Sequence, residues 1–335
     1  ERYSHMIRFP TNLLVCEGPD CVGKTSLYNA THKVSRFSWN IQDRSWLSML
    51  VYGRLYGRDT NQLSRGLWEE LTCLNNRVIL VLPTWDIVAE RFKSRGDDFQ
   101  DIISLKKLHE IFDEYREQLE FLPNVKVIDN SELSIEDSAD VVSGWVRSKE
   151  IYGLDEIAAE VLRFVSNVPG TMTPKDCEAT LDFTFYDDVV FTEREECDDG
   201  EWSHTIPYLE EQEDEDEILS DPDEGEYYTK ILTEFLTKIR GEFCGINEYK
   251  EKQTSASRRF VYTDDTCISF IQAMHRGNTL DFHTVLRSSN VAKTFIKDLR
   301  FIHYLASRVV ECRPEFRSIK EVRFRFNINS AHLVR

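Results

Sequence analysis

The stretch Gly18-Pro19-Asp20-Cys21-Val22-Gly23-Lys24-Thr25 matches the phosphate-binding loop pattern G-x-x-x-x-G-K-[ST] at every fixed position. An apolar run, residues 12–16, precedes it, and residues 26–30 form a helix-compatible run after it. Backbone N–H groups of such a loop surround phosphate oxygens, and the helix N-terminus adds partial positive charge. The pattern therefore predicts a nucleoside triphosphate site in a strand–loop–helix unit. The alternative is a plain glycine turn between a strand and a helix.

The fixed positions of this loop have separate chemical tasks. Gly18 and Gly23 let the backbone close around phosphate oxygens. Lys24 is placed to reach the β- and γ-phosphates, and the Thr25 hydroxyl to hold Mg²⁺. The predicted ligands of this site are accordingly ATP and Mg²⁺.

Composition limits the classes of function. The 335 residues include 59 acidic and 41 basic side chains, for a formal net charge of −18. Broad nonspecific nucleic-acid binding is therefore disfavoured, although a local basic cleft is not. The eight cysteines form no C-x-x-C pair, which indicates reduced thiols. With no membrane-length apolar run and no secretory signal, we expect a soluble cytoplasmic protein (host cytoplasm if viral) without a membrane partner.

The first domain is expected to span residues 6–149 and to alternate strands with helices, which is typical of a parallel α/β sheet. Ser134 is placed to cap a helix, with Asp137 three residues on as in a capping box. The expected strands are residues 13–16, 77–82 and 125–129, and the expected helices are residues 85–95, residues 102–122 and one that starts after Ser134.

Two further segments of this domain carry charge patterns suited to phosphate. One is Asp43-Arg44-Ser45-Trp46, and the other, residues 90–98, reads E-R-F-K-S-R-G-D-D. They resemble the D-R-Y/H and E-R-x-x-x-R-G lid segments of the thymidylate kinase group of nucleotide kinases. That resemblance implies that Asp43 and Arg44 orient the acceptor phosphate. It also implies that Arg91 and Arg95 clamp the transferring phosphoryl group beside Lys24.

Without the resemblance, these charges have ordinary explanations. Asp43 and Arg44 could form a surface ion pair, and Arg91 and Arg95 a solvated helix face. The chain also departs from the kinase pattern, because only about sixteen residues separate Ser26 from Asp43. Members of the group carry there a longer segment with an arginine and an aromatic residue that hold the nucleobase. A shortened version (Arg36, Phe37 and Trp39) implies an open acceptor site.

Residues 193–226 form a strongly acidic segment. Such a run repels itself and buries little apolar surface, so it predicts a mobile surface insertion in the second domain. A metal site is the alternative.

The second domain is expected to span residues 150–335 and to be α+β. Its residues Cys267, Arg287-Ser288 twenty positions later, Asp298 and His332 follow one another in an order that resembles the thymidylate synthase superfamily. The resemblance implies that Cys267 is the nucleophile and that Arg287 and Ser288 bind the nucleotide phosphate. Arg258 and Arg259 resemble the arginine pair that each subunit lends to its partner, which implies a homodimer.

The same resemblance implies a particular reaction at a pyrimidine. A Cys267 thiolate adds to C6 of the ring, C5 attacks methylene-tetrahydrofolate, and Arg287 lowers the thiol pKa. Asp298 stands where the synthases carry an asparagine, and aspartate there accompanies cytidylate hydroxymethylases. Asn290 replaces a folate-contacting aspartate, and Val334 stands in place of a sugar-binding tyrosine. An inactive, synthase-like domain is the alternative.

Together the two resemblances imply successive steps: hydroxymethylation of dCMP or dUMP, then phosphorylation of the product, as in bacteriophage DNA base modification. A second hypothesis is a kinase that acts on a hydroxymethylpyrimidine already in DNA. A third is a kinase whose second domain only dimerises or regulates.

Overall fold

The computed structural model describes residues 7–95, 101–169, 179–193, 205–209, 215–240, 260–312 and 314–333. These residues divide into two compact units. Residues 10–151 and those from Arg163 to residue 169 form the N-terminal unit, and residues 7–9, 152–162 and those from Ala179 onward form the C-terminal unit. Residues 7–8 form a strand of the C-terminal unit. The domain boundary predicted from the sequence, at residue 149, placed these residues in the first domain.

The N-terminal unit contains a four-stranded parallel sheet. Its strands are ordered β3 (Ile41–Asp43), β2 (Leu13–Glu17), β4 (Asn76–Val81) and β5 (Val125–Ile128), and every neighbouring pair is parallel. Strands β2 and β4 are almost continuously apolar and buried, as expected of strands covered on both faces. The strands predicted at residues 13–16, 77–82 and 125–129 are therefore present, with ends that differ by a residue.

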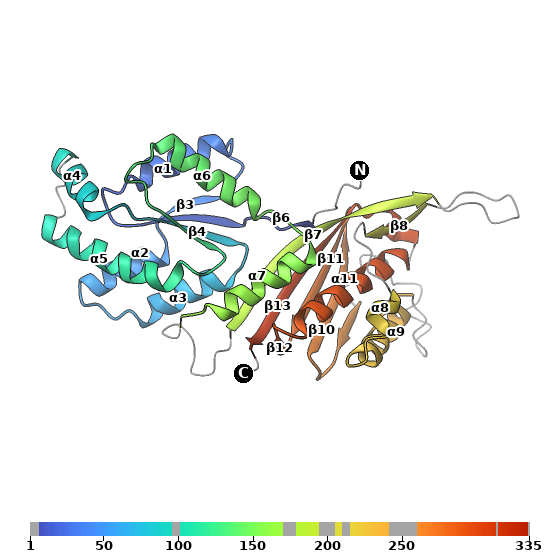
Figure 1. Ribbon diagram of the computed structural model, residues 1–335. Helices are drawn as coiled ribbons and strands as arrows, with labels where there is room; N and C mark the ends of the chain where they lie inside the picture. Colours follow the sequence, from blue (N-terminus) through green and yellow to red (C-terminus); the bar gives the residue numbers. More distant parts are fainter. Residues whose placement is uncertain are drawn as a thin grey trace, which may run out of the picture. The chain divides into compact units, whose positions relative to one another are not determined.

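Helices cover both faces of this sheet (Figure 1). Helices α1 and α6 lie on one face, and α2, α3 and α5 lie on the other, while α4 contacts α5 at the left end of the unit. Their bounds are α1 Lys24–Val34, α2 Trp46–Leu55, α3 Asn61–Thr72, α4 Trp85–Arg95, α5 Ile102–Leu119 and α6 Ile135–Ser148. The predicted helices correspond to α4, α5 and α6. The sequence patterns did not predict β3, α2 or α3, because β3 is only three residues long and α2 is apolar on several sides.

The C-terminal unit is built on a mixed, mainly antiparallel sheet. Its order is β6-β1-β7-β13-β11-β10-β9, with β12 paired to β13 and β8 paired to β7; β11 and β12 run parallel to β13. The strands are β1 Ile7–Arg8, β6 Ile151–Tyr152, β7 Ala179–Glu193, β8 Thr205–Leu209, β9 Val261–Thr263, β10 Ile268–Arg276, β11 Thr279–Leu286, β12 Ser289–Asn290 and β13 Glu321–His332.

One face of this sheet forms the core of the unit. Side chains alternate along β7 and β13, so that Phe183 stacks on Phe326 with ring centroids 5.2 Å apart, and Phe185 stacks on Phe324 at 4.6 Å. Helix α11 (Phe295–Glu311) packs on this layer, where Phe295 meets Phe183 edge-on. The remaining described helices are α7 Leu154–Ser166, α8 Glu215–Leu219, α9 Gly225–Arg240 and the 3₁₀ turn Pro314–Ser318. The boundary between the two units falls within α7, after Leu162. The unit is α+β, and its resemblance to thymidylate synthases stays a prediction.

The described part of the acidic segment, residues 193–226, contains packed helices and a strand, whereas the sequence predicted a mobile surface insertion. Its described part includes β8, α8 and the start of α9, while residues 194–204 and 210–214 lie outside the described residues. Leu209 and Ile218 are buried, because apolar residues spaced among the acids pack inward while the carboxylates stay exposed. In the described residues no helix is long and apolar enough to cross a membrane.

Ser134 caps α6 as the sequence predicts. Its Oγ accepts a hydrogen bond from the Asp137 backbone N–H at 3.0 Å and donates to the Asp137 carboxylate at 2.6 Å. Ser134→Ala should therefore lower the free energy of unfolding by about 1 kcal/mol. Ser148→Ala, at the other end of the same helix, is the matched control and should change it by less than about 0.5 kcal/mol. Five of the six tryptophans lie in residues 10–151, so tryptophan fluorescence in urea reports this unit. Equal effects of the two substitutions would contradict the capping role.

Candidate functional site

The glycines of the phosphate-binding loop hold backbone conformations that other residues adopt at a cost. Gly18 has φ 143° and Gly23 has φ 87°. A Cβ atom at Gly18 would lie 2.4 Å from the Val81 carbonyl oxygen, so the loop packs directly on the end of β4. Gly23 precedes the first residue of α1, and its left-handed conformation turns the chain into the helix. The predicted strand–loop–helix unit is present.

A cavity of about 180 Å³ opens beside this loop at the N-terminus of α1. Three cationic side chains (Lys24, Arg44 and Arg95) contribute to its lining, together with the Thr25 hydroxyl and the Asp20 carboxylate. Burial lowers the pKa of Lys24, and the nearby Arg44 lowers it further. The Asp43 and Asp20 carboxylates offset part of the repulsion among these cations, and an anion bound in the cavity would offset more of it.

Asp43 lies next to the first residues of α1. The Thr25 hydroxyl donates a hydrogen bond to Asp43 Oδ2 at 3.0 Å, and Lys24 Nζ lies 3.9 Å from Asp43 Oδ1. Oδ1 is buried and has no hydrogen-bond partner among the described residues. A carboxylate oxygen with free acceptor capacity beside a hydroxyl suits Mg²⁺, which prefers oxygen ligands. No group of three or more His, Cys, Asp or Glu side chains in the described ranges could bind a metal, so phosphate and water would complete its coordination.

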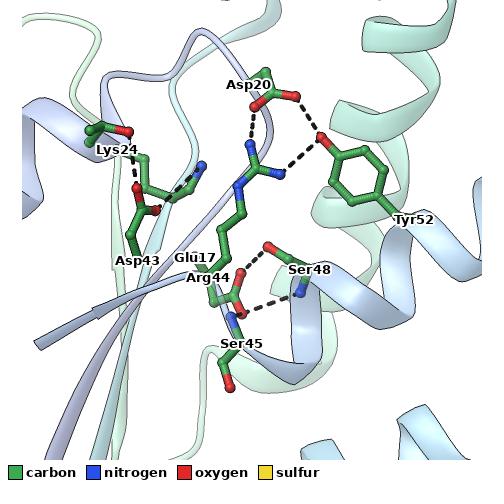
Figure 2. Close-up of polar contacts among 9 residues, drawn as sticks. Glu17, Asp20, Lys24, Asp43, Arg44, Ser45, Ser48 and Tyr52 are labelled. Atoms are coloured by element: carbon green, nitrogen blue, oxygen red, sulfur yellow. Dashed lines mark hydrogen bonds and ion pairs between the residues drawn. The ribbon is translucent and has the colours of Figure 1, made fainter. Parts of the chain in front are cut away.

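Arg44 does not pair with its neighbour Asp43. Its guanidinium forms an ion pair with Asp20 and donates to the Tyr52 hydroxyl at 3.1 Å, and Tyr52 in turn donates to Asp20 at 2.5 Å (Figure 2). Arg44 holds φ 70°, a left-handed conformation that is uncommon for a residue with a side chain. The simple ion pair between positions 43 and 44 is therefore absent, and Arg44 joins the phosphate-binding loop to α2.

The buried carboxylate of Glu17 stabilises the chain next to Arg44 at the start of α2. Glu17, the last residue of β2, accepts hydrogen bonds from the backbone N–H of Ser45 at 2.7 Å and of Ser48 at 3.2 Å, and from the Ser48 hydroxyl. Ser45 and Ser48 begin α2, so Glu17 caps that helix in place of Ser45, whose own side chain makes no cap (Figure 2). The Ser45 hydroxyl donates instead to Glu70 of α3. Burial raises the pKa of Glu17.

The two lid arginines have different positions. Arg91 donates from Nη1 to the Val22 carbonyl at 3.0 Å and from Nη2 to the Asn130 carbonyl at 3.1 Å, while Asn130 Nδ2 donates to the same Val22 carbonyl at 2.9 Å. Arg91 therefore braces the phosphate-binding loop, in contrast with the expectation that both arginines face the phosphoryl group. Arg95, one turn further along α4, contributes to the cavity lining.

The shortened segment before β3 does not reach the cavity. Phe37 is 73% exposed and stacks on His32, Trp39 packs on the core of the unit, and neither these nor Arg36 contributes to the cavity lining. That this shortened segment leaves the acceptor site open stays a prediction. The sequence motifs assigned no role to Glu17, Asp20, Tyr52, Glu70 or Asn130. The only sequence signal for Glu17 was an acidic residue that ends an otherwise apolar strand.

The C-terminal unit brings several of its predicted residues together. The Arg287 N–H donates to the Cys267 carbonyl at 2.8 Å across the β10–β11 hairpin, and Asn290 is the register partner of His332. Ser288 lies between β11 and β12. Asp298 is buried in the first turn of α11 and accepts a hydrogen bond from Tyr228 at 2.9 Å. Arg258, Arg259 and Val334 lie outside the described residues.

The thiol of Cys267 has a raised pKa, whereas the resemblance implied a lowered one. Partial burial of the thiol raises its pKa although the residue as a whole is exposed, Asp298 and Glu224 raise it further, and the lowering by Arg287 is the smallest contribution. Burial also raises the pKa of Asp298 to about 7. Arg287 does lower the thiol pKa as expected, but the net direction is upward, because burial and the nearby carboxylates outweigh the arginine.

No protein-family model and no curated protein matches this chain. Among solved structures, the YorR protein of Bacillus subtilis in complex with phosphorylated GDP aligns at 18% identity and a TM-score of 0.34, over 40% of this chain and 95% of its own. Deoxyadenosine kinase from M. mycoides, with products dCMP and dCDP bound, aligns at 12% identity and a TM-score of 0.29, over 41% of this chain and 99% of its own. At such low scores these likenesses assign no role to any residue of this chain.

Glu70 should make the stability of the N-terminal unit depend on pH. Burial raises its pKa to about 7, far above the value of about 4.3 in an unfolded chain. The folded state therefore binds this proton more tightly, and the unit loses stability as pH rises from about 4 to about 7. Glu70→Gln removes this loss, so the variant should exceed the wild type in unfolding free energy at pH 8 by up to about 3 kcal/mol, and by little at pH 4.

Urea unfolding followed by tryptophan fluorescence between pH 4 and pH 8 measures this difference. Glu69→Gln is the matched control, because Glu69 is the exposed neighbour on α3 and pairs with Arg65 only at the surface. If the Glu70→Gln and wild-type curves stay parallel across this range, Glu70 does not titrate as described.

Cys267 should react slowly with alkylating reagents although it is exposed. Asp298→Asn removes a negative charge that raises the thiol pKa, so alkylation by iodoacetamide at pH 7.5 should accelerate roughly threefold or more. Mass spectrometry of the Cys267 peptide gives the rate. Asp188→Asn, which changes an exposed acid that pairs with Arg8, is the control and should leave the rate unchanged. A fast wild-type reaction that Asp298→Asn does not change would show that the carboxylate has no influence on the thiol.

Proposed function

We propose that the N-terminal unit transfers the γ-phosphoryl group of a nucleoside triphosphate to a nucleotide, with Mg²⁺ as its metal. The observation that carries the proposal is the convergence of Lys24, Arg44 and Arg95 on one cavity at the N-terminus of α1. Backbone N–H groups of the loop and the helix dipole add to the same positive field. A glycine turn that only connects a strand to a helix would not require three cationic side chains around a cavity.

The transfer breaks the bond between the γ-phosphorus and the β–γ bridging oxygen and forms a bond from the γ-phosphorus to an acceptor phosphate oxygen. Negative charge is spread over the equatorial oxygens as the group moves, and fixed positive charge stabilises it. Lys24 is placed for the β- and γ-phosphates, and Arg95 for the moving group. Arg91 and Asn130 keep the Val22 carbonyl fixed, so the loop N–H groups need not reorganise on binding.

Thr25 and Asp43 are the residues that would hold Mg²⁺. The metal, when bound with the triphosphate, neutralises phosphate charge during transfer. Asp43 Oδ1, which accepts no hydrogen bond among the described residues, and the Thr25 hydroxyl provide the hard oxygen ligands that it prefers.

The acceptor phosphate is assigned to Arg44, held by Asp20 and Tyr52 at the rim of the cavity. The resemblance to thymidylate kinases favours a pyrimidine deoxynucleotide, including a C5-modified one. A panel of deoxynucleoside monophosphates, tested for phosphate transfer from radiolabelled ATP, separates these acceptors.

Pyrimidine C5 chemistry in the C-terminal unit has less support. The raised pKa of Cys267 opposes the thiolate that addition to C6 needs. Hydroxymethylation of dCMP or dUMP with methylene-tetrahydrofolate, dimerisation through this unit and a part in bacteriophage base modification stay predictions. Release of tritium from C5 of labelled dCMP or dUMP is the direct assay of that chemistry.

Lys24→Ala and Arg95→Ala should each lower kcat for phosphoryl transfer on the order of 10²-fold, as the loss of one charge-stabilising donor does in other enzymes. Lys93→Ala is the matched control for Arg95, because Lys93 is an exposed cation two residues away on α4 and does not contribute to the cavity lining. Its kcat should stay within about twofold of the wild type. Equal rates for Arg95→Ala and Lys93→Ala would remove Arg95 from the site, and an active Lys24→Ala variant would overturn the assignment of the loop.

A further inference from the structure

The short segment that joins β3 to α2 is attached to β2 on one side. Arg44 has φ 70°, and its backbone N–H donates to the Cys16 carbonyl at 3.0 Å. Ser45, the next residue, is buried, and its backbone N–H donates to Glu17 at 2.7 Å (Figure 2). A left-handed conformation at a residue with a side chain persists only where the surrounding contacts determine it. These two bonds supply part of that constraint.

The same segment is attached to α3 on its other side. The Ser45 hydroxyl donates to Glu70, so the backbone and the side chain of one serine bind two different carboxylates. Trp46, the following residue, packs on Gly66, where an added Cβ would lie 2.5 Å from the indole ring. Gly66 lies one helical turn before Glu70 on α3, and the missing side chain lets the ring approach the helix backbone. The two residues that follow Arg44 therefore both contact α3.

Glu70 is a buried carboxylate with a single described donor. The Ser45 hydroxyl is the only group among the described residues that donates a hydrogen bond to it, and its Oε1 is buried without such a partner. Burial raises its pKa to about 7 and the nearby Glu17 carboxylate contributes to this rise, whereas the bond from Ser45 acts in the opposite direction. Buried carboxylates with shifted pKa values occur most often at functional sites.

We propose that Glu70 is a positioning residue for the acceptor: through the Ser45 hydroxyl it holds Arg44 in the conformation that binds the acceptor phosphate. The inference rests on the proposed phosphoryl transfer and adds to it a residue from α3. Glu70 does not contribute to the lining of the phosphate cavity, whereas Arg44 does. Its effect on the acceptor therefore passes through Ser45 and the backbone of Arg44.

The population of the Arg44 conformation connects Glu70 to acceptor binding. Arg44 lies between Asp43, the last residue of β3, and Ser45, and its guanidinium pairs with Asp20 at the cavity. If the bond from Ser45 to Glu70 is lost, one neighbour of Arg44 is held less firmly, and Arg44 occupies this conformation for less of the time. The apparent affinity for the acceptor falls by the same fraction, whereas the chemical step in the bound complex is unchanged.

The test compares kinetic constants for transfer from radiolabelled ATP to the best acceptor among the deoxynucleoside monophosphates. Glu70→Ala should raise the KM of the acceptor about tenfold, because a hydrogen bond to a charged group is lost. Glu70→Gln keeps a neutral oxygen for the Ser45 hydroxyl, so the KM should rise only about threefold. In both variants, kcat and the KM of ATP should stay within about twofold of the wild type.

A double variant shows whether the effect passes through Ser45. Ser45→Ala should raise the KM of the acceptor about as much as Glu70→Ala does. The double variant should raise it no further, because both substitutions remove the same bond. Glu69→Gln is the matched control, since Glu69 is the exposed neighbour on α3 and pairs with Arg65, and its constants should equal those of the wild type.

Thermal melting identifies the variants that are folded at the assay temperature. If Glu70→Ala is not folded, Ser45→Ala and Glu70→Gln provide the same comparison. A loss of folded enzyme lowers kcat and leaves both KM values unchanged, so it differs from the expected rise in the KM of the acceptor.

Three results would overturn the inference and leave the proposed function intact. The first is an unchanged acceptor KM in the folded variants of Glu70 and Ser45. The second is a fall in kcat with both KM values unchanged, and the third is additive effects of Ser45→Ala and Glu70→Ala. If the wild type transfers phosphate to no nucleotide, the proposed function itself is wrong, and the positioning role with it.

Discussion

The buried carboxylate of Glu17 is the constraint on which the candidate site depends. It ends the strand that leads into the phosphate-binding loop, and it accepts two backbone N–H groups and a hydroxyl at the start of α2. Burying a carboxylate is costly unless hydrogen bonds satisfy it, so these three bonds fix α2 against β2. Arg44, two residues before α2, is thereby held in its left-handed conformation with its guanidinium next to Asp20.

The far side of the loop is fixed by a second set of contacts. Arg91 and Asn130 both donate to the Val22 carbonyl, so that α4 and the end of β5 hold the loop opposite to α2. A loop fixed by two sets of contacts reorganises less when a ligand binds. The two lid arginines then have complementary tasks, since Arg91 shapes the loop and Arg95 faces the cavity.

Sequence patterns predicted the parts of this site that depend on local chain geometry. The loop glycines, Lys24, Thr25 and the cap at Ser134 follow from short motifs, and the apolar runs located β2, β4 and β5 within a residue. The partners of Arg44 could not be predicted in the same way. Asp20 and Tyr52 meet it only because β3 lies beside β2 and α2 turns back over the loop, which no local pattern encodes.

The C-terminal unit shows why residue spacing alone does not establish a reaction. The interval between Cys267 and Arg287 corresponds to a real proximity, because the β10–β11 hairpin joins their backbones. Yet a thiol's pKa depends on burial and on every nearby charge, and here burial, Asp298 and Glu224 oppose the arginine. Spacing predicted which residues meet, whereas their chemistry follows from the carboxylates that the fold adds around them.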